Sequence, residues 1–515
     1  NGVPVLLEGE TGCSKTLSAE IICKYIYEKK NKEKNLNISR EHEGFIKFSL
    51  SSDVKINDLI AKFIGNKNSL SGLKIVEGPF LRAFKEGIPL ILDEINLASE
   101  DILQCIEGAL DGDEININIS GIGTISQKKK EGFCLIATQN PNKDNYMNKR
   151  QNLSKSFVSH FQLINFPCFE IEELKEIALK LFESFNGGKE LEKKDIRAIN
   201  DLIEFHKEWT SLDEVKNEMI CFTIREIAAT VKAYIDENKQ NIFKIVKVIY
   251  GSRYTNEKKL KMFEILKKYE SFKNDLNEKM NSCLNYNIPG FYPNKILNEV
   301  IESAMFSLEK KRNIMIVGNF GTGKSHIARE ITKLYNSKIN KQEFYHFICT
   351  EETKISDLIG YISPRREKDI NQDEIIMEWK EGFLSNSIEN GTIVILDNLQ
   401  EADATITERL NGLLDIKYDE GKKKGAKRKF DIPENPDKSS IDIHKDFRII
   451  GVCDSQNITN MSPAFLNRFD IIILENQLTN LNENELKEII KTILYRKEEK
   501  EEEEKEEEEK EEEEK

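Results

Sequence analysis

One stretch near the start of the sequence restricts the fold more than any other. The apolar run Val3–Leu7 leads into the turn GETGCSKT and then into a segment with helical character. A buried strand, a glycine-containing turn that ends in Lys-Thr, and a helix together form a phosphate-binding motif, in which backbone N–H groups surround phosphate oxygens. Lys15 would add a positive charge, and the Thr16 hydroxyl would be a ligand of Mg²⁺. We therefore expect a nucleoside triphosphate site at Gly9, Glu10, Thr11, Gly12, Cys13, Ser14, Lys15 and Thr16.

A second copy of this motif follows the apolar run Asn313–Val317. Its residues are Gly318, Asn319, Phe320, Gly321, Thr322, Gly323, Lys324 and Ser325, and they match the pattern G-x-x-x-x-G-K-[ST] completely. The first copy departs at Ser14, where the second glycine is expected. Since that glycine permits close approach of the backbone to phosphate, we expect Ser14 to weaken binding without abolishing it. The alternative, an ordinary strand-turn-helix connection, is disfavoured because the motif recurs.

The two motifs belong to a long internal repeat. Lys15 and Lys324 are 309 residues apart, and Asp93 and Asp397 are 304 apart. The segments 55–65 and 77–94 also resemble 354–364 and 379–398. A repeat of about 300 residues is too long for a solenoid and indicates duplicated domains. We expect an α/β fold with five parts: a first core at 1–168, a helical lid and linker at 169–285, a second core at 286–474, the start of a second lid at 475–497, and an acidic low-complexity tail at 498–515.

Composition limits the class of protein. The chain has 515 residues, of which 32% are charged and 39% hydrophobic, as expected for a soluble protein of two to four domains. Its net charge of −14 comes largely from the tail, where 14 Glu and 4 Lys leave only −4 for the rest. The body is therefore not a basic nucleic-acid binder, and we expect no direct DNA binding.

The cysteines and the hydrophobicity pattern indicate the compartment. The nine cysteines form no C-x-x-C pair, which favours a reducing, intracellular setting without a zinc framework. No apolar run is long enough to span a membrane, and no signal peptide is visible. The sequence begins without Met, almost inside its first strand, and we interpret it as a fragment of a longer protein.

Polar residues follow two further apolar runs of the first core. Pro89–Leu92 delivers Asp93 and Glu94, and Phe133–Ala137 leads to Asn140. Residues at the carboxyl ends of parallel strands meet at the ligand site. Asp93 would hold Mg²⁺ through water, Glu94 would orient the attacking water, and Asn140 would bind that water or the γ-phosphate. An Asp-Glu pair alone could equally be a surface turn. Its separation in sequence from the phosphate loop favours a nucleotide site instead.

The second core differs at these positions. Ser325 and Asp397 are retained as candidate metal ligands, but Asn398 stands where Glu is expected and Asp454 aligns with Asn140. An amide can hydrogen-bond water but cannot take up a proton, so we expect hydrolysis to suffer more than binding.

Local patterns outside these motifs give further expectations. Lys55–Phe63 is predicted to be a short helix, and Ile115–Ile119 one arm of an inserted hairpin. Amphipathic segments predict the lid helices Glu172–Phe185, Lys194–Trp209 and Phe222–Glu237. The helical lid is expected to continue through Lys258–Met280 and to be followed by a linker at Asn281–Tyr292. The basic segment Gly421–Lys429 is interpreted as a solvated insert, with partner binding as the alternative.

The sequence boxes LDEINLAS, ATQNP, SPAFLNRF and FTIRE, together with the two phosphate loops, resemble tandem AAA+ modules. The nearest branch is the midasin-like, dynein-related one, and the resemblance covers nearly the whole chain apart from the tail. It implies a ring or pseudo-ring in which nucleotide lies between adjacent modules and an arginine finger reaches in from the neighbour. Arg468 matches the finger, whereas His160 occupies that position in the first core, with Arg150 nearby. Arg225 matches the lid sensor, or is an exposed lid-helix arginine.

Together these residues lead to one functional hypothesis. The first site, completed by Arg468, would hydrolyse ATP with Mg²⁺, and the second would bind ATP and hold it. The resemblance implies a mechanochemical ATPase that remodels protein or ribonucleoprotein assemblies, such as precursors of the large ribosomal subunit, in the nucleus or nucleolus; otherwise we expect the cytoplasm. Its expected partners are adjacent AAA+ modules and the substrate, and we expect no association with a membrane.

The main alternative is a nucleotide-gated scaffold with little turnover. A nucleic-acid motor or a GTP-specific relative is a third interpretation. The tail is interpreted as solvated, with contact to basic proteins as the alternative.

Overall fold

The computed structural model describes residues 3–33, 44–50, 54–65, 73–112, 114–119, 123–141, 152–189, 191–216, 222–240, 242–272, 295–341, 343–369, 372–414, 428–432, 435, 438, 440–475 and 487. The predicted linker, most of the basic segment, nearly all of the second lid and the acidic tail lie outside these residues.

Two parallel five-stranded sheets form the centres of the two cores. The first has the order β2 (Ile46–Ser49), β5 (Leu90–Asp93), β8 (Leu135–Gln139), β1 (Val5–Gly9) and β9 (Gln162–Phe166). The second has the order β11 (Phe344–Ile348), β14 (Ile393–Asp397), β17 (Arg448–Asp454), β10 (Ile314–Gly318) and β18 (Asp470–Leu474). The registers also agree, because Gly9 pairs with Phe166 and Gly318 with Leu474. The predicted α/β fold with two duplicated cores is confirmed.

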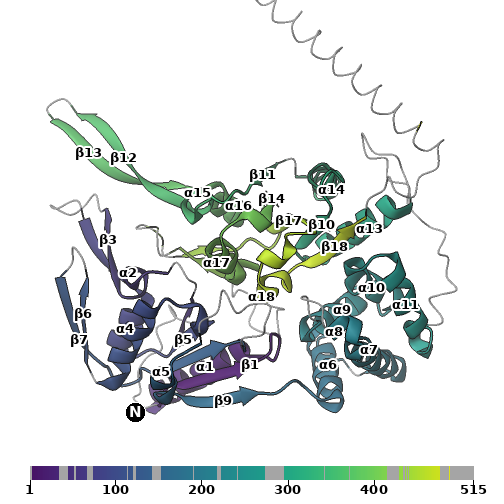
Figure 1. Ribbon diagram of the computed structural model, residues 1–515, viewed down its shortest axis with the longest axis horizontal. Helices are drawn as coiled ribbons and strands as arrows, with labels where there is room; N and C mark the ends of the chain where they lie inside the picture. Colours follow the sequence, from purple (N-terminus) through teal and green to yellow (C-terminus); the bar gives the residue numbers. More distant parts are fainter. Residues whose placement is uncertain are drawn as a thin grey trace, which may run out of the picture.

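Helices pack on the sheets of both cores, and the second core has an additional one, α13 (Figure 1). The first core has α1 (Lys15–Glu33), α3 (Pro79–Glu86), α4 (Glu100–Asp111) and α5 (Lys155–Ser159). The second core has α13 (Lys295–Glu309), α14 (Lys324–Lys338), α16 (Phe383–Asn390), α17 (Ala404–Leu414) and α18 (Pro463–Leu466). Helices α1 and α14 begin directly at the phosphate-loop lysines, so each loop connects the carboxyl end of a central strand to a helix N-terminus.

Antiparallel hairpins extend from the cores. In the first core β6 (Glu114–Ile119) pairs with β7 (Gly123–Lys128), which confirms the predicted hairpin arm. The predicted helix Lys55–Phe63 is wrong in its second half, because α2 ends at Leu59 and β3 (Ala61–Gly65) pairs with β4 (Leu73–Glu77). The Gly78 N–H donates to the Ile60 carbonyl at 2.6 Å and holds the base of this hairpin closed, so long-range pairing overrides the local helical pattern. The second core repeats the arrangement with α15 (Ile355–Ile359), β12 (Gly360–Asp369) and β13 (Gln372–Glu381).

The helical lid lies between the two cores in the sequence and has its own apolar centre. It consists of α6 (Ile171–Phe185), α7 (Lys193–Ser211), α8 (Asp213–Lys216), α9 (Ile224–Asp236), α10 (Ile242–Ile249), the 3-10 helix η3 (Gly251–Arg253) and α11 (Asn256–Leu266). Phe222 stacks on Tyr250 with ring centroids 4.8 Å apart, and the buried Trp209 packs edge-on against Tyr254. Within the described part of the chain, no helix is long and apolar enough to cross a membrane.

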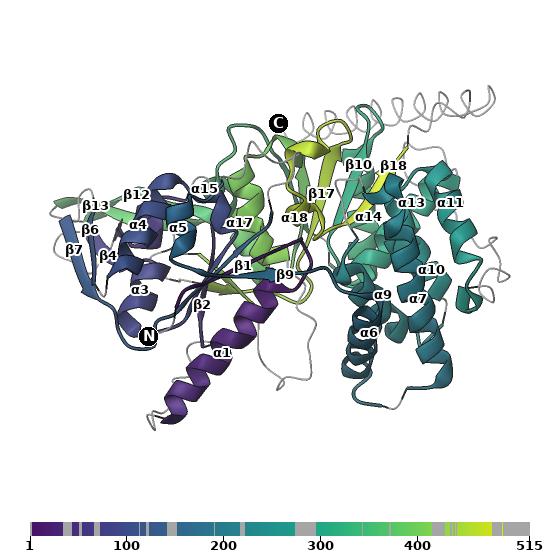
Figure 2. The same ribbon diagram turned by 60° about the horizontal axis from the view of Figure 1, so that its bottom comes forward.

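The surroundings of the two cores differ although their folds match. In the second core α13 packs against α14 and β18, and Ile331 of α14 is fully buried. Ile22, the aligned residue of α1, is 44% exposed, and Ile164 of β9 is 41% exposed where Ile472 of β18 is buried. Figure 2 shows α1 extending beyond the rest of the first core, although its Ala19 and Cys23 pack against the sheet. The duplicated cores therefore bury the same face to different extents.

His206 in the lid predicts a pH-dependent stability. Its Nδ1 lies 2.9 Å from the Tyr250 hydroxyl, and burial lowers the pKa of the imidazole to about 4. In the unfolded chain the pKa of histidine is near 6.5, so below that pH the unfolded state binds a proton that the folded state excludes. We expect the free energy of unfolding of the lid to fall by about 2 kcal/mol from this group between roughly pH 7 and 5.

Urea unfolding followed by Trp209 fluorescence in a Trp379→Phe background measures this loss. The control is His206→Asn, which retains a polar partner for Tyr250 but does not titrate in this range. The pH dependence of the variant should be smaller by the same amount, and an equal dependence in both proteins would contradict the assignment.

Candidate active site

The phosphate loop of the first core is organised around the Lys15 ammonium. Its Nζ donates to the carbonyls of Gly9 and Glu10 and to Oδ1 of Asn140, each at 2.8 Å. The side chain is buried, with only 6% of the residue exposed. Three oxygens therefore hold this positive charge at the carboxyl end of β1, where an anionic phosphate oxygen would be favoured in their place.

Asp93 lies on the neighbouring side of the loop, at the end of β5. Its Oδ1 accepts a hydrogen bond from the Thr16 hydroxyl at 3.0 Å and another from the hydroxyl of Thr138. Lys47 Nζ lies 3.9 Å from the other carboxylate oxygen. A hydroxyl and a carboxylate are thus adjacent at the loop, as the oxygen ligands of a hard cation require. Sequence reasoning missed Thr138 and Lys47, although Thr138 lies in β8, the strand that leads to Asn140.

Glu94 and Asn140 also lie together. Glu94 has left-handed backbone geometry, with φ 55°, and its Oε1 accepts from the Asn140 side-chain amide. The Glu94 backbone N–H donates to Thr138 Oγ1 at 3.3 Å, and the Asn96 amide donates to the Asn140 carbonyl at 3.0 Å. The structure thus brings together all five residues that the sequence predicted for the first site: Lys15, Thr16, Asp93, Glu94 and Asn140.

The backbone conformation at Ser14 distinguishes the first phosphate loop from the second. Ser14 has φ 62°, and the corresponding Gly323 of the second loop has φ 79°. This left-handed region is costly for a residue with a Cβ atom, so the first loop carries strain that the second avoids. The adjacent Cys13 is buried, and burial together with the nearby Cys168 thiol raises its pKa to about 11. Cys13 is therefore a neutral thiol near pH 7.

The second site repeats the scaffold with different charges. Lys324 Nζ donates to the carbonyls of Gly318 and Asn319 at 2.8 and 2.7 Å, as Lys15 does in its own loop. Asp454 takes the place of Asn140 and lies 3.7 Å from Lys324 Nζ. A carboxylate here adds a negative charge beside the loop lysine, which an amide does not.

The residue that follows Asp397 also differs between the two sites. Asn398 has the same left-handed geometry as Glu94, with φ 51°, but carries no carboxylate. Its backbone N–H donates to Asp397 Oδ1 at 3.0 Å, and His346 Nε2 lies 3.1 Å from the other oxygen of Asp397. Site two therefore retains a loop and an acidic strand end, but not the set of groups found at site one.

The two short helices that precede β9 and β18 are also equivalent. Ser154 and Ser462 are the N-cap residues of α5 and α18, and each side chain accepts from the backbone N–H three residues later at 3.1 Å. His160 and Arg468 therefore occupy the same structural position. His160 lies 3.3 Å from Glu107, whereas Arg468 Nη1 donates to the Ala464 carbonyl. Figures 1 and 2 both show α18 close to the turn between β1 and α1.

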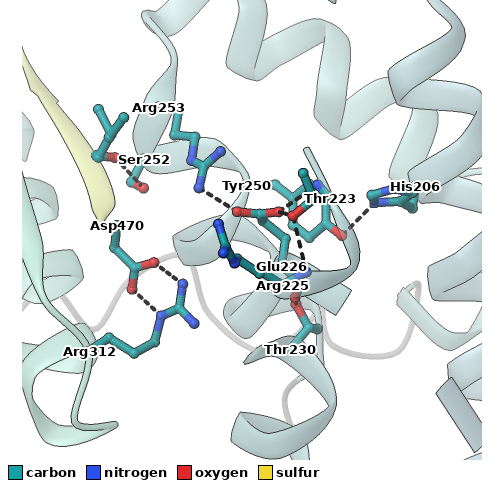
Figure 3. Close-up of polar contacts among 11 residues, drawn as sticks. His206, Thr223, Arg225, Glu226, Thr230, Tyr250, Ser252, Arg253, Arg312 and Asp470 are labelled. Carbon is teal, nitrogen blue, oxygen red and sulfur yellow. Dashed lines mark hydrogen bonds and ion pairs between the residues drawn. The ribbon is translucent and has the colours of Figure 1, made fainter. Parts of the chain in front are cut away.

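The lid also reaches the first phosphate loop. A Cβ atom added to Gly12, which has φ 88°, would lie 2.6 Å from the Cβ of Thr223. Thr223 is the N-cap residue of α9, and its Oγ1 accepts from the Arg225 backbone N–H at 3.2 Å. Arg225 therefore belongs to the first turn of a helix that starts against the loop, and Figure 3 shows its side chain extending from α9 toward the side of Asp470.

Comparison with known proteins agrees with this geometry. The family model described as AAA domain (dynein-related subfamily) matches residues 4–161 and 313–469. Midasin of Giardia intestinalis is 23% identical over 96% of this chain, and midasin of Dictyostelium discoideum is 22% identical over 82%. The chain spans 11% and 8% of these two relatives. The uncharacterized protein YojN of Bacillus subtilis is 28% identical over 39% of this chain and 59% of its own length.

The strained turn at Ser14 predicts opposite effects on stability for two matched substitutions, one in each phosphate loop. We expect Ser14→Gly to stabilise the first core by about 1 kcal/mol, since the left-handed geometry no longer opposes a Cβ atom. Gly323→Ser is the matched change in the second loop and should destabilise its core by a similar amount. Hydrogen exchange of the two loop-helix segments measures both effects. A Ser14→Gly protein with an unchanged or lower stability would contradict the interpretation.

Proposed function

Because the chain belongs to the dynein-related subfamily of AAA domains, we propose that it is an ATPase that binds ATP with Mg²⁺ and hydrolyses it mainly at the first site. The observation that carries this proposal is the convergence of three chain segments at one edge of the sheet. Lys15 contacts Asn140, Asn140 contacts Glu94, and Thr16 contacts Asp93. A cradle, a carboxylate pair and a polar amide together are what phosphoryl transfer to water requires.

Nucleotide binding is the first step of the proposal. The backbone N–H groups of residues 9–16 and the N-terminus of α1 would surround the β- and γ-phosphates, with Lys15 as their counter-charge. Thr16 and Asp93 fit an Mg²⁺ ion, since their oxygens already lie 3.0 Å apart at the loop. When bound, this ion would neutralise charge on the phosphate oxygens. Gly318 to Ser325, with Asp397, would hold a second nucleotide in the same manner.

Hydrolysis is the second step. Glu94 would orient the attacking water and accept its proton, and Asn140 would hydrogen-bond the water or the γ-phosphate. Arg468 of the second core would supply the positive charge that stabilises the transition state, with Arg225 as a lid sensor. The proximity of α18 to the first phosphate loop in both views supports this shared site (Figures 1 and 2).

The second site would retain nucleotide rather than turn it over. Asn398 cannot accept a proton, and the Asp454 carboxylate near Lys324 opposes further negative charge. These two substitutions also support the alternative function, a nucleotide-gated scaffold with little turnover in the whole chain. Measuring the steady-state turnover rate together with the number of tightly bound nucleotides distinguishes the ATPase from the scaffold. The ATPase should show steady turnover with one retained nucleotide.

The last part of the proposal concerns the substrate and the compartment of this ATPase. The similarity to midasins supports a chain that acts with adjacent AAA+ modules of a larger protein to remodel a protein or ribonucleoprotein complex. We propose precursors of the large ribosomal subunit as the substrate and the nucleus as the compartment.

Removing the carboxylate of Glu94 tests the hydrolytic role. We expect Glu94→Gln to lower the turnover number by roughly 10²- to 10⁴-fold, because the water loses its general base, while ATP binding changes little. Phosphate release and equilibrium binding of labelled ATP measure the two quantities. The matched control is Asn398→Gln at the second site, which should leave turnover unchanged. Normal hydrolysis in Glu94→Gln would refute the assignment.

Removing the guanidinium of Arg468 tests the shared site. We expect Arg468→Ala to lower turnover by at least about 10²-fold with nearly normal ATP binding at the first site, because the positive charge acts mainly in the transition state. His160→Ala removes the side chain at the equivalent position of the first core and is the control, with turnover expected to stay normal. If the two variants behaved alike, Arg468 would not be part of the site.

A further inference from the structure

A continuous set of contacts connects the first phosphate loop to the second core through the lid. It begins where Gly12 packs against Thr223, the residue that starts α9. The tight fit leaves no room for a larger residue at Gly12. The position of the helix start and the position of the loop therefore depend on one another.

Glu226 is the next residue in this set of contacts. One of its carboxylate oxygens accepts from the Thr223 backbone N–H at 2.6 Å and from the Thr223 hydroxyl at 3.1 Å. The other accepts from Arg253 Nη2 at 2.7 Å. Both side chains are buried, at 0% and 3% exposure. One carboxylate thus closes the start of α9 and also pairs with η3 (Figure 3).

The adjoining residue of η3 contacts the second core. Ser252 Oγ donates to the Ile471 carbonyl of β18 at 2.8 Å. The first residue of that strand, Asp470, forms a two-pronged ion pair with Arg312, whose Nε donates at 2.7 Å. Figure 3 shows this pair beside the Glu226–Arg253 pair. Strand β18 begins two residues after Arg468, so the lid contacts the same segment that carries the proposed finger.

Two buried ion pairs lie next to this interface, Glu226–Arg253 in the lid and Arg312–Asp470 in the second core. Burial disfavours ionisation of Glu226, but Arg253, the Thr223 N–H and the more distant Arg312 together lower its pKa below the ordinary value. Arg253 also lies over the Phe222 ring, 4.9 Å from its centroid. Within the described chain, its Nε and Nη1 are buried without a hydrogen-bond acceptor, so Glu226 provides its one ion pair. Loss of that carboxylate would leave a buried charge uncompensated.

We propose that Glu226 and Arg253 are positioning residues for the first site, which set the place of β18, and hence of Arg468, relative to the phosphate loop. This inference rests on the proposed function, because it requires Arg468 to act at the first site. A pair that only held the lid together would stabilise the chain without affecting the rate of the chemical step. The two roles therefore differ in their effect on the turnover number at saturating ATP.

The main test is Glu226→Gln in the full chain. The amide keeps the shape of the side chain and an acceptor for Thr223, but it removes the charge that Arg253 requires. We expect the turnover number to fall about tenfold while the dissociation constant of ATP at the first site changes less than about twofold, since binding uses the loop and turnover also uses Arg468. Arg253→Met should give the same pattern.

Asp195→Asn is the matched control for loss of a buried lid ion pair. Asp195 is 1% exposed and accepts from Lys239 at 2.7 Å, within the lid and not at the interface with the second core. We expect a lower melting temperature with an unchanged turnover number. Ser252→Ala removes only the hydroxyl that contacts β18, and should lower turnover about threefold with little loss of stability; it keeps the test decisive should Glu226→Gln fail to fold.

Combining the lid variants with Arg468→Ala separates this inference from the proposed function. If Glu226 acts through the finger, Glu226→Gln should cause no further loss of turnover in the Arg468→Ala background. An equal tenfold loss in that background, or a Glu226→Gln protein that behaves like Asp195→Asn, would overturn the positioning role and leave the proposed function intact. The same holds for a Ser252→Ala protein with normal turnover. Unchanged turnover in Arg468→Ala alone would instead overturn the shared site, and the positioning role with it.

Discussion

The contact between the Lys15 ammonium and the Asn140 amide is the interaction on which the rest of the first site depends. It joins the loop after β1 to the end of β8, and it is possible only because these strands are parallel neighbours in the sheet. The same adjacency between β8 and β5 places Thr138 against Asp93. The order of the strands therefore determines which polar residues meet, and the glycine-rich turn determines how closely a phosphate can approach them.

The duplicated cores show how much chemistry changes while such a scaffold stays constant. Glu94 and Asn398 have the same left-handed backbone and start the same 3-10 turn, yet one supplies a carboxylate and the other an amide. Asn140 and Asp454 make the opposite exchange beside their lysines. The first site thus places its negative charge where a water molecule would be activated, and the second places it where a phosphate would lie. The side chains at these positions have changed while the backbone geometry has not.

The parts of the site that could be predicted from the sequence are those carried by local patterns. Apolar runs followed by Lys15, Asp93 or Asn140 mark the ends of buried strands, and parallel pairing brings such ends together. Thr138 could not be distinguished from other polar strand residues, because its role arises from a partner 45 residues away. The β3–β4 hairpin was missed for a related reason, since a short apolar segment forms a strand only when a distant partner pairs with it.

The interface between the lid and the second core lies beyond sequence prediction altogether, because its contacts join residues separated by long stretches of chain. Ser252 and Ile471 are 219 residues apart, and Glu226 would read as an ordinary capping residue of α9. Full burial gives that carboxylate its importance: in water the pair with Arg253 would contribute little, whereas in the interior each charge requires the other. In the proposed positioning role, this pair holds η3 against the start of α9, and the Ser252 hydrogen bond joins η3 to β18. A displacement of the loop against Thr223 would then change the position of the segment that carries Arg468.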